Sequence, residues 1–340
     1  TCRNGEEGLN KLGGEIMTNQ LSLPWPQMNE VIMSNGAQYD PNNIYHHNTF
    51  AGSGDYDNYN AQIMTIADDC FDLETENPVV ANYLVDAYKK YIDMGVDAFR
   101  VDTARHISRI TMNAGILPKL QAEAEKIGND DFYMFGEVCT RGHDVWYRGV
   151  PAISTCFYTW DDSDSEKAKW SNTDLANNEA LAEACYNNNT SADNQPTSDN
   201  AFLNGNDYHQ PDYSKRSDMG VIDFQMHWSF ENANNAFSTA LGEDRYFNDS
   251  TWNVVYVNSH DYSPDFCSDK VYTGDTDAWA ENLSLMFTFR GIPCVYYGTE
   301  IEFQKGCPID KGPKAMLSET GRAYYGDNIE GTIQASDFTV

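Results

Sequence analysis

Three acidic residues stand after three apolar, strand-like runs, where their carboxyl groups could act together in one reaction. Asp102 follows the run 97–101, Glu137 follows 132–136, and Asp261 comes shortly after 252–257. Parallel strands of a barrel present their carboxyl ends on one face, so acids that are far apart in the sequence can converge there. A single acid of this kind would more readily be a helix cap or a hydrogen-bond acceptor. The three together predict an active site.

The elements that must position these acids alternate between strands and helices. Apolar runs predict strands near residues 97, 132, 219, 253 and 292, and helical patterns occupy about 78–94, 107–127, 229–241 and 277–289. This alternation is typical of parallel α/β folds. Residues 1–76 predict an irregular subdomain, and 77–340 predict part of a barrel with a long insertion at about 138–218. A barrel needs eight strands, and no further strand pattern occurs in 1–76.

Composition limits the partners of the chain. The 340 residues include 52 acidic and 22 basic side chains, a net charge of −30, which argues against nucleic acid and anionic membranes. No run approaches the ~18 apolar residues that span a bilayer. The eight cysteines lack CxxC or Cys-His spacing, which argues against a zinc site, and some of them could pair in a secreted protein. We expect an extracellular protein.

Four segments in chain order resemble motifs of the α-amylase family, glycoside hydrolase family 13. Segment 99–106 is similar to the motif of that family's fourth strand, 135–138 to the fifth, 257–261 to the seventh and 291–300 to the eighth. Segment 71–78 is similar to the end of its domain B. The resemblance runs from about 41 to 332. It implies a TIM (β/α)8 barrel, of which this chain holds strands four to eight, preceded by a domain B-like region at 1–76.

The resemblance also implies a retaining double displacement, in which Asp102 is the nucleophile, Glu137 the general acid and base, and Asp261 the transition-state stabiliser. Such a mechanism requires one ionised and one protonated carboxyl group about 5–5.5 Å apart. Arg100, on the same strand face as Asp102, could keep that carboxylate ionised, and burial would raise the pKa of Glu137. Arg100 could instead form a structural salt bridge.

Further residues match substrate and metal positions of the family. The resemblance implies substrate contacts for Arg100, Arg105, His106 and His260, with arginine at 105 where the family often has lysine. It also implies structural calcium held by the Asp72 carboxylate and the His106 backbone carbonyl. Calcium takes six to eight oxygens, and Asp72 could simply cap a turn. Tyr158 and Trp160 could stack on sugars, although packing in the core is the more common role of such residues.

The chain also departs from the family pattern. Asn258-Ser259 precede His260 where the family usually has another pair, so the support of the Asp261 carboxylate differs. The third-strand motif and the C-terminal β-domain do not occur in this sequence. We therefore expect that the remainder of a longer polypeptide completes the barrel, because an open half-barrel would expose two unpaired edges.

Three functions follow from these motifs. The first is a secreted α-amylase that cleaves internal α-1,4 bonds of starch or maltooligosaccharides. The second uses the same chemistry for transfer, as in a cyclodextrin glucanotransferase. The third is an amylase-like binding protein without catalysis, against which the presence of all three acids argues.

Overall fold

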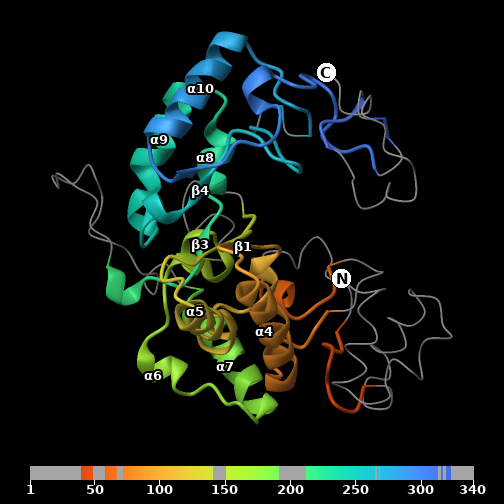
Figure 1. The fold of residues 1–340 in the computed structure, drawn as a ribbon, viewed down its shortest axis with the longest axis vertical. Coiled ribbons are helices and arrows are strands. Elements are labelled where there is room, and N and C mark those ends of the chain that lie inside the picture. The colour runs from red at the N-terminus through yellow and green to blue at the C-terminus, as the bar shows by residue number, and fades with distance from the viewer. Residues whose placement is uncertain are drawn as a thin grey trace. The chain divides into compact units, whose positions relative to one another are not determined.

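A computed structural model describes residues 40–48, 58–66, 72–140, 151–190, 212–264, 266–267, 269–312, 315–316 and 319–322 (Figure 1). The chain divides into two compact units, which we describe separately. The first consists of Thr1–Thr140, Val145–Thr197 and Asp212–Val221, and the second of Arg141–Asp144, Ser198–Pro211 and Ile222–Val340. The predicted boundary between residues 76 and 77 falls inside the first unit.

The first unit is built on a parallel sheet in the order β1-β2-β3. Strand β1 is Ala98–Val101, β2 is Tyr133–Gly136 and β3 is Gly220–Val221. Val101 lies opposite Gly136 in the first pair, and Phe135 lies opposite Gly220 in the second. Strands therefore occur at the predicted places near 97, 132 and 219, although each of them is short.

Local signals explain helix α4 (Pro78–Asp93), which precedes β1. The side chain of Asn77 accepts a hydrogen bond from the Val79 amide, and Pro78, which needs no hydrogen-bond partner for its nitrogen, begins the helix. Val80, Val85 and Ile92 are buried along one face. Gly95, with a φ of 90°, ends the helix in the left-handed conformation that glycine adopts without strain.

The predicted helix at 107–127 has two parts. Thr111–Ile116 is π-helical, with the Leu117 amide donating to the carbonyl of Met112, and the α-helix α5 is Leu117–Lys126. Pro118 has no N–H to give to the preceding turn, which accounts for the irregular start. Helices α4 and α5 lie side by side (Figure 1).

The region predicted as an insertion contributes two helices to the first unit. Helix α6 is Asp164–Lys167 and α7 is Leu175–Asn188. The side chain of Asp174 accepts from the Asn177 amide and so begins α7. Short 3-10 helices in the two units are Tyr59–Gln62, Ala104–His106, Pro151–Ile153, Cys156–Thr159, Tyr213–Lys215, Asp244–Tyr246, Ser250–Trp252 and Thr299–Ile301.

The second unit contains the parallel pair β4 (Val254–Val255) and β5 (Ile292–Pro293), with helices α8 (Phe224–Ser229), α9 (Ala233–Glu243) and α10 (Thr276–Thr288). Ile222 forms a parallel bridge to Val254. The strand predicted near 219 is short, because Asp223 accepts from the Met226 amide and starts α8. The helix predicted at 229–241 is likewise interrupted, because Asn232 caps α9.

A buried ion pair ties these elements of the second unit together. The Arg290 guanidinium donates to the Asp223 carboxylate at 2.8 Å and to the Ala240 carbonyl at 2.9 Å. Asp223 is fully buried, so it depends on this partner. The apolar core beside it consists of Met226, Phe230, Ala236, Ala240, Val255, Val257, Cys267, Tyr272, Trp279 and Met286.

Sheets, cysteines and helices of the described residues bear on a closed barrel, on disulfides and on a membrane span. Their strands form a three-stranded and a two-stranded sheet, without a closed barrel. Six cysteines in these ranges are free thiols, at positions 139, 156, 185, 267, 294 and 307, and Cys2 and Cys70 lie outside them. Within the same ranges, no helix combines the length and the apolar character that crossing a bilayer requires.

Gly136 is a sharp test of packing at the end of β2. A Cβ atom there would lie 2.8 Å from the Met219 side chain and 2.9 Å from the Ala104 Cβ. Gly136→Ala should therefore destabilise the protein by roughly 1–3 kcal/mol in urea unfolding. Gly242, in α9, has no heavy atom within 4 Å of such a Cβ. Gly242→Ala, the control, should stabilise the protein by roughly 0.5–1 kcal/mol. Equal stability of the two variants would contradict the packing described here.

Candidate active site

The register of β1 and β2 brings Asp102 and Glu137 together. Each acid directly follows its strand, and the strands pair with Val101 opposite Gly136. The Glu137 amide then donates to the Val101 carbonyl at 2.8 Å, which continues the parallel ladder by one residue. Two carboxyl groups 35 positions apart in the sequence thus meet at one end of the sheet.

Arg100 lies between these two acids. Its Nη1 is 3.1 Å from Asp102 Oδ1, and its Nη2 is 3.3 Å from Glu137 Oε2. The ion pair that the sequence predicted between Arg100 and Asp102 is present, and the same guanidinium also contacts Glu137. One planar, permanently charged group therefore positions both carboxyl groups.

Thr103 adds a second contact to Glu137 from an unusual backbone conformation. Its φ of 49° is left-handed, which is uncommon for a β-branched residue and costs free energy. The Thr103 amide donates to Glu137 Oε2 at 3.3 Å. The turn after Asp102 thus points a backbone N–H at the neighbouring acid.

The two acids differ in protonation because their surroundings differ. A hydrogen bond to Glu137 lowers the pKa of Asp102, burial opposes this, and the Arg100 charge lowers it further. Burial raises the pKa of Glu137, and the hydrogen bond to Asp102 raises it further. The Arg100 charge opposes these two effects only in part, so the pKa of Glu137 is about 7. The Asp102 side chain is 70% exposed and that of Glu137 only 12%. Near pH 6 Asp102 is ionised and Glu137 holds the proton.

Arg105 and His106 follow in the short helix Ala104–His106. Arg105 is buried and donates to the Cys139 carbonyl at 2.6 Å. The His106 ring Nδ1 lies 2.6 Å from the Ala61 carbonyl. Burial lowers the pKa of His106 to about 4. The hydrogen bond to Ala61 opposes this shift, and the charge of the nearby Arg105 adds to it. The ring is therefore neutral and Nδ1 carries the proton. The substrate contacts expected of both residues stay predictions.

Tyr158 and Trp160 lie in the interior of the first unit. They are 1% and 3% exposed, and the Tyr158 hydroxyl donates to the Ile107 carbonyl at 2.6 Å. In this structure the two side chains therefore pack in the core, the second of the two roles considered for them, and do not form a surface for sugars.

In the second unit, Asp261 is held from two sides. His260 Nε2 lies 2.9 Å from Asp261 Oδ2, and Arg322 Nη1 donates to Oδ1 at 2.8 Å. The Ser259 hydroxyl accepts from the Asp261 amide at 3.2 Å, so the residue that departs from the family pattern supports the turn. Arg322 was not predicted from the sequence, because it follows Asp261 by 61 positions and belongs to no recognisable motif.

The predicted site residues thus fall into two groups. Arg100, Asp102 and Glu137 lie together in the first unit, and His260 and Asp261 lie together in the second. Because each unit is described separately, the convergence of all three acids stays a prediction.

The expected calcium ligand Asp72 lies beside a cluster that the sequence analysis missed. Its Oδ2 is 2.7 Å from His46 Nδ1, and the other nitrogen of that ring faces Glu74 and Glu76. Three side chains of types that bind metals, His46, Glu74 and Glu76, have ligand atoms that all lie within 4.8 Å of one another. Within the described ranges they are the group of three that meets this distance. Asp72 and His106 are not members of it. The signal in the sequence was the spacing of acids at every second position, 72, 74 and 76.

Comparison with known proteins identifies the family. The model of the α-amylase catalytic domain matches residues 25–322, and the chain belongs to this family. It is 25% identical over 292 residues to a cyclomaltodextrin glucanotransferase of Bacillus licheniformis, a match that covers 85% of this chain. It is 40% identical over 68 residues to an α-amylase of Streptomyces lividans, which is 20% of this chain and 7% of that protein.

The match covers a minor part of the longer relatives. It spans 31% of the length of the Bacillus licheniformis protein. Among solved structures, an α-amylase from Malbranchea cinnamomea aligns over 84% of this chain and 52% of that chain, with a TM-score of 0.44 and 17% identity.

The pKa of Glu137 can test the geometry around Arg100. We expect its carboxyl carbon to titrate near pH 7 in 13C NMR, against an ordinary value of 4.5. Asp102→Asn should lower this pKa, because it removes a neighbouring carboxylate, and Arg100→Met should raise it, because it removes the cation. Glu166→Gln, on α6, is the control and should leave it unchanged. Titration of Glu137 near 4.5 in the unmodified protein would disprove the arrangement.

Proposed function

We propose that this chain carries the catalytic acids of a retaining glycoside hydrolase that cleaves internal α-1,4 bonds of starch and related glucans. The observation that carries the proposal is the Asp102–Glu137 pair, in which Arg100 and unequal burial favour one ionised and one protonated carboxyl group. A retaining mechanism requires this division of roles.

In this mechanism, the Asp102 carboxylate attacks the anomeric carbon while Glu137 gives its proton to the departing glycosidic oxygen. Glu137 then accepts a proton from water, and that water releases the sugar from Asp102. Bound substrate would have to part the hydrogen-bonded acids to about 5–5.5 Å. The substrate oxygen then takes the place of Asp102 as acceptor of the Glu137 proton. Asp261, held by His260 and Arg322, would stabilise positive charge on the sugar.

Transfer to a second sugar is the alternative with the same chemistry. Its support is that several relatives of this chain are glucanotransferases, among them the cyclomaltodextrin glucanotransferases of Bacillus licheniformis and Klebsiella oxytoca. The two reactions share the sugar bound to Asp102 and differ only in whether water or a sugar hydroxyl accepts it.

We further propose that the parallel strands belong to a TIM (β/α)8 barrel whose other strands come from outside the described residues, in a longer secreted polypeptide. The burial of the strands supports this. β3 and β4 are buried, whereas β1 alternates between exposed and half-buried positions and β5 is exposed. In a complete parallel sheet, the strands are buried because helices cover both faces. The exposure of β1 and β5 therefore favours further elements that pack against them.

A structural calcium ion is also part of the proposal. The Asp72 carboxylate and the His106 carbonyl are oxygen donors of the kind that calcium prefers, and they leave about four to six positions for other oxygens. The His106 ring joins its turn to the segment around Ala61, and an ion held by both donors would join the segment of Asp72 to the same turn.

Loss of the acid tests the enzyme against the binding protein. We expect the full-length protein to release reducing ends from soluble starch, and Glu137→Gln to lower kcat by at least ~10²-fold, because no group then protonates the leaving oxygen. Glu166→Gln is the matched control. A folded, calcium-supplied protein without activity would refute the proposal and favour a binding protein. If maltooligosaccharides gave cyclic or lengthened products, transfer would be the activity in place of hydrolysis.

Removal of calcium tests the metal proposal. Chelation with EGTA should lower the thermal unfolding temperature by roughly 5–10 °C, and added Ca²⁺ should restore it, since a ligand at 100 times its Kd contributes about 2.7 kcal/mol. Asp72→Asn should abolish this response. Asp86→Asn, an exposed change on α4, should preserve it. An unfolding temperature that is indifferent to EGTA would contradict a calcium site.

A further inference from the structure

Two segments of the first unit pair in antiparallel fashion and place four ionisable side chains together. Tyr45 and Leu73 form an antiparallel bridge. The His46 amide donates to the Asp72 carbonyl at 3.0 Å, and the Glu74 amide donates to the Ile44 carbonyl at 2.9 Å. Alternate residues of an extended segment share a face, so the acids at 72, 74 and 76 line up beside the His46 ring.

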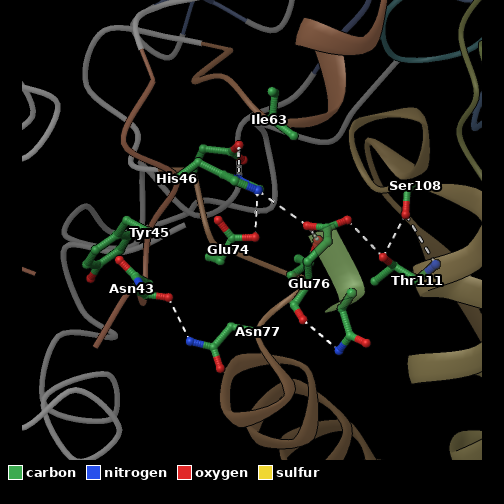
Figure 2. A network of polar contacts seen from close by, with 12 residues as sticks. Asn43, Tyr45, His46, Ile63, Glu74, Glu76, Asn77, Ser108 and Thr111 are labelled. Carbon is green, nitrogen blue, oxygen red and sulfur yellow. Dashed lines mark hydrogen bonds and ion pairs between the residues drawn. The ribbon is translucent and has the colours of Figure 1, made fainter. Parts of the chain in front are cut away.

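Both nitrogens of the His46 ring face carboxylates. Nδ1 is 2.7 Å from Asp72 Oδ2, while Nε2 is 3.0 Å from Glu74 Oε1 and 3.3 Å from Glu76 Oε2. Figure 2 shows the Glu74 and Glu76 carboxylates converging on the ring. A proton on Nδ1, donated to Asp72, leaves the lone pair of a neutral ring on Nε2. That lone pair then points at two carboxylate oxygens, an arrangement that requires a positive charge between them.

Burial makes this requirement strict. The side chains of His46, Glu74 and Glu76 are 5%, 5% and 1% exposed. Apart from the His46 ring, Glu74 Oε1 has no hydrogen-bond donor within the described part of the chain. A single proton on Nε2 can serve only one of the two glutamates. Buried charges without such partners are costly unless they bind a metal.

Glu76 is fixed in position by other contacts. Its Oε1 accepts from the Thr111 hydroxyl at 2.8 Å, and its Oε2 accepts from the Thr75 hydroxyl at 3.2 Å. Asp72 similarly orients the ring of His46 from the far side. Carboxylates that orient a ligating histidine in this way are common around metals.

The cluster is accessible from a hollow of about 790 Å³. His46, Glu74 and Glu76 line it, together with Glu179 and Glu183 of α7. The acidic lining attracts cations, so an ion has a path to the cluster.

We propose that His46 Nε2 and one carboxylate oxygen each of Glu74 and Glu76 bind a divalent transition-metal ion of the zinc type. Ligands about 2.1 Å from a tetrahedral ion lie about 3.4 Å apart, close to the separations found here. Imidazole nitrogen and carboxylate oxygen are both zinc ligands, whereas calcium prefers oxygen ligands alone. The site needs no cysteine, so the cysteine spacing does not bear on it. The site does not depend on the proposed glycosidase activity, but it shares Asp72 with the proposed calcium site, because the Asp72 carboxylate orients the His46 ring.

Cobalt provides the test, because Co²⁺ takes zinc sites and absorbs visible light. Titration of the metal-free full chain with Co²⁺ should saturate at one equivalent, and Zn²⁺ should displace it. Glu74→Gln and Glu76→Gln, which keep the side-chain size, should each weaken binding at least ~10-fold. Glu179→Gln, at the same hollow, is the matched control and should bind as the unmodified chain does.

A second measurement removes the dependence on variants that fail to fold. Addition of Zn²⁺ should shift the Nε2 resonance of His46 in 15N NMR of the unmodified chain, assigned as the histidine signal that is lost in a His46→Gln variant and kept in His47→Gln. Three results would overturn the site: no stoichiometric Co²⁺ binding, unchanged binding in both folded glutamine variants, or displacement of Co²⁺ by an equal concentration of Ca²⁺.

Discussion

Asp102 and Glu137 meet because β1 and β2 run parallel in one register, with Val101 opposite Gly136. A shift of one residue would turn the side chains after both strands to opposite faces. The register also fixes the identity of residue 136, since the Met219 side chain and the Ala104 methyl group fill the space that a larger side chain would need. The packing around Gly136 and the placement of the acids are therefore parts of one constraint.

Electrostatics then separates two acids that are chemically alike. Arg100 contacts both, so its charge alone cannot tell them apart, and the difference comes from the hydrogen bond between the two acids together with their unequal exposure to water. The same principle appears at His46, whose ring faces three carboxylates in a buried place. In each case a few buried charges determine which protons stay bound.

Sequence reasoning located the strands and the acids that follow them, because apolar runs and strand-end carboxylates are local signals. It could not foresee that Asp223 would end β3 and begin a helix, since an aspartate suits either context. Arg322 and the His46 cluster were missed for another reason. Their contacts join distant segments, and only the chain pairing of Tyr45 with Leu73 shows that His46 and the acids from 72 to 76 share a face.

The left-handed Thr103 described above bears on attempts to make this protein more heat-tolerant. Glycine or asparagine would relax its backbone and raise stability, the usual gain at such positions. The contact to Glu137 comes from the backbone N–H of residue 103, which both replacements keep, and both adopt the same φ. Position 103 therefore offers a gain in heat tolerance beside the catalytic acid without loss of the group that contacts it.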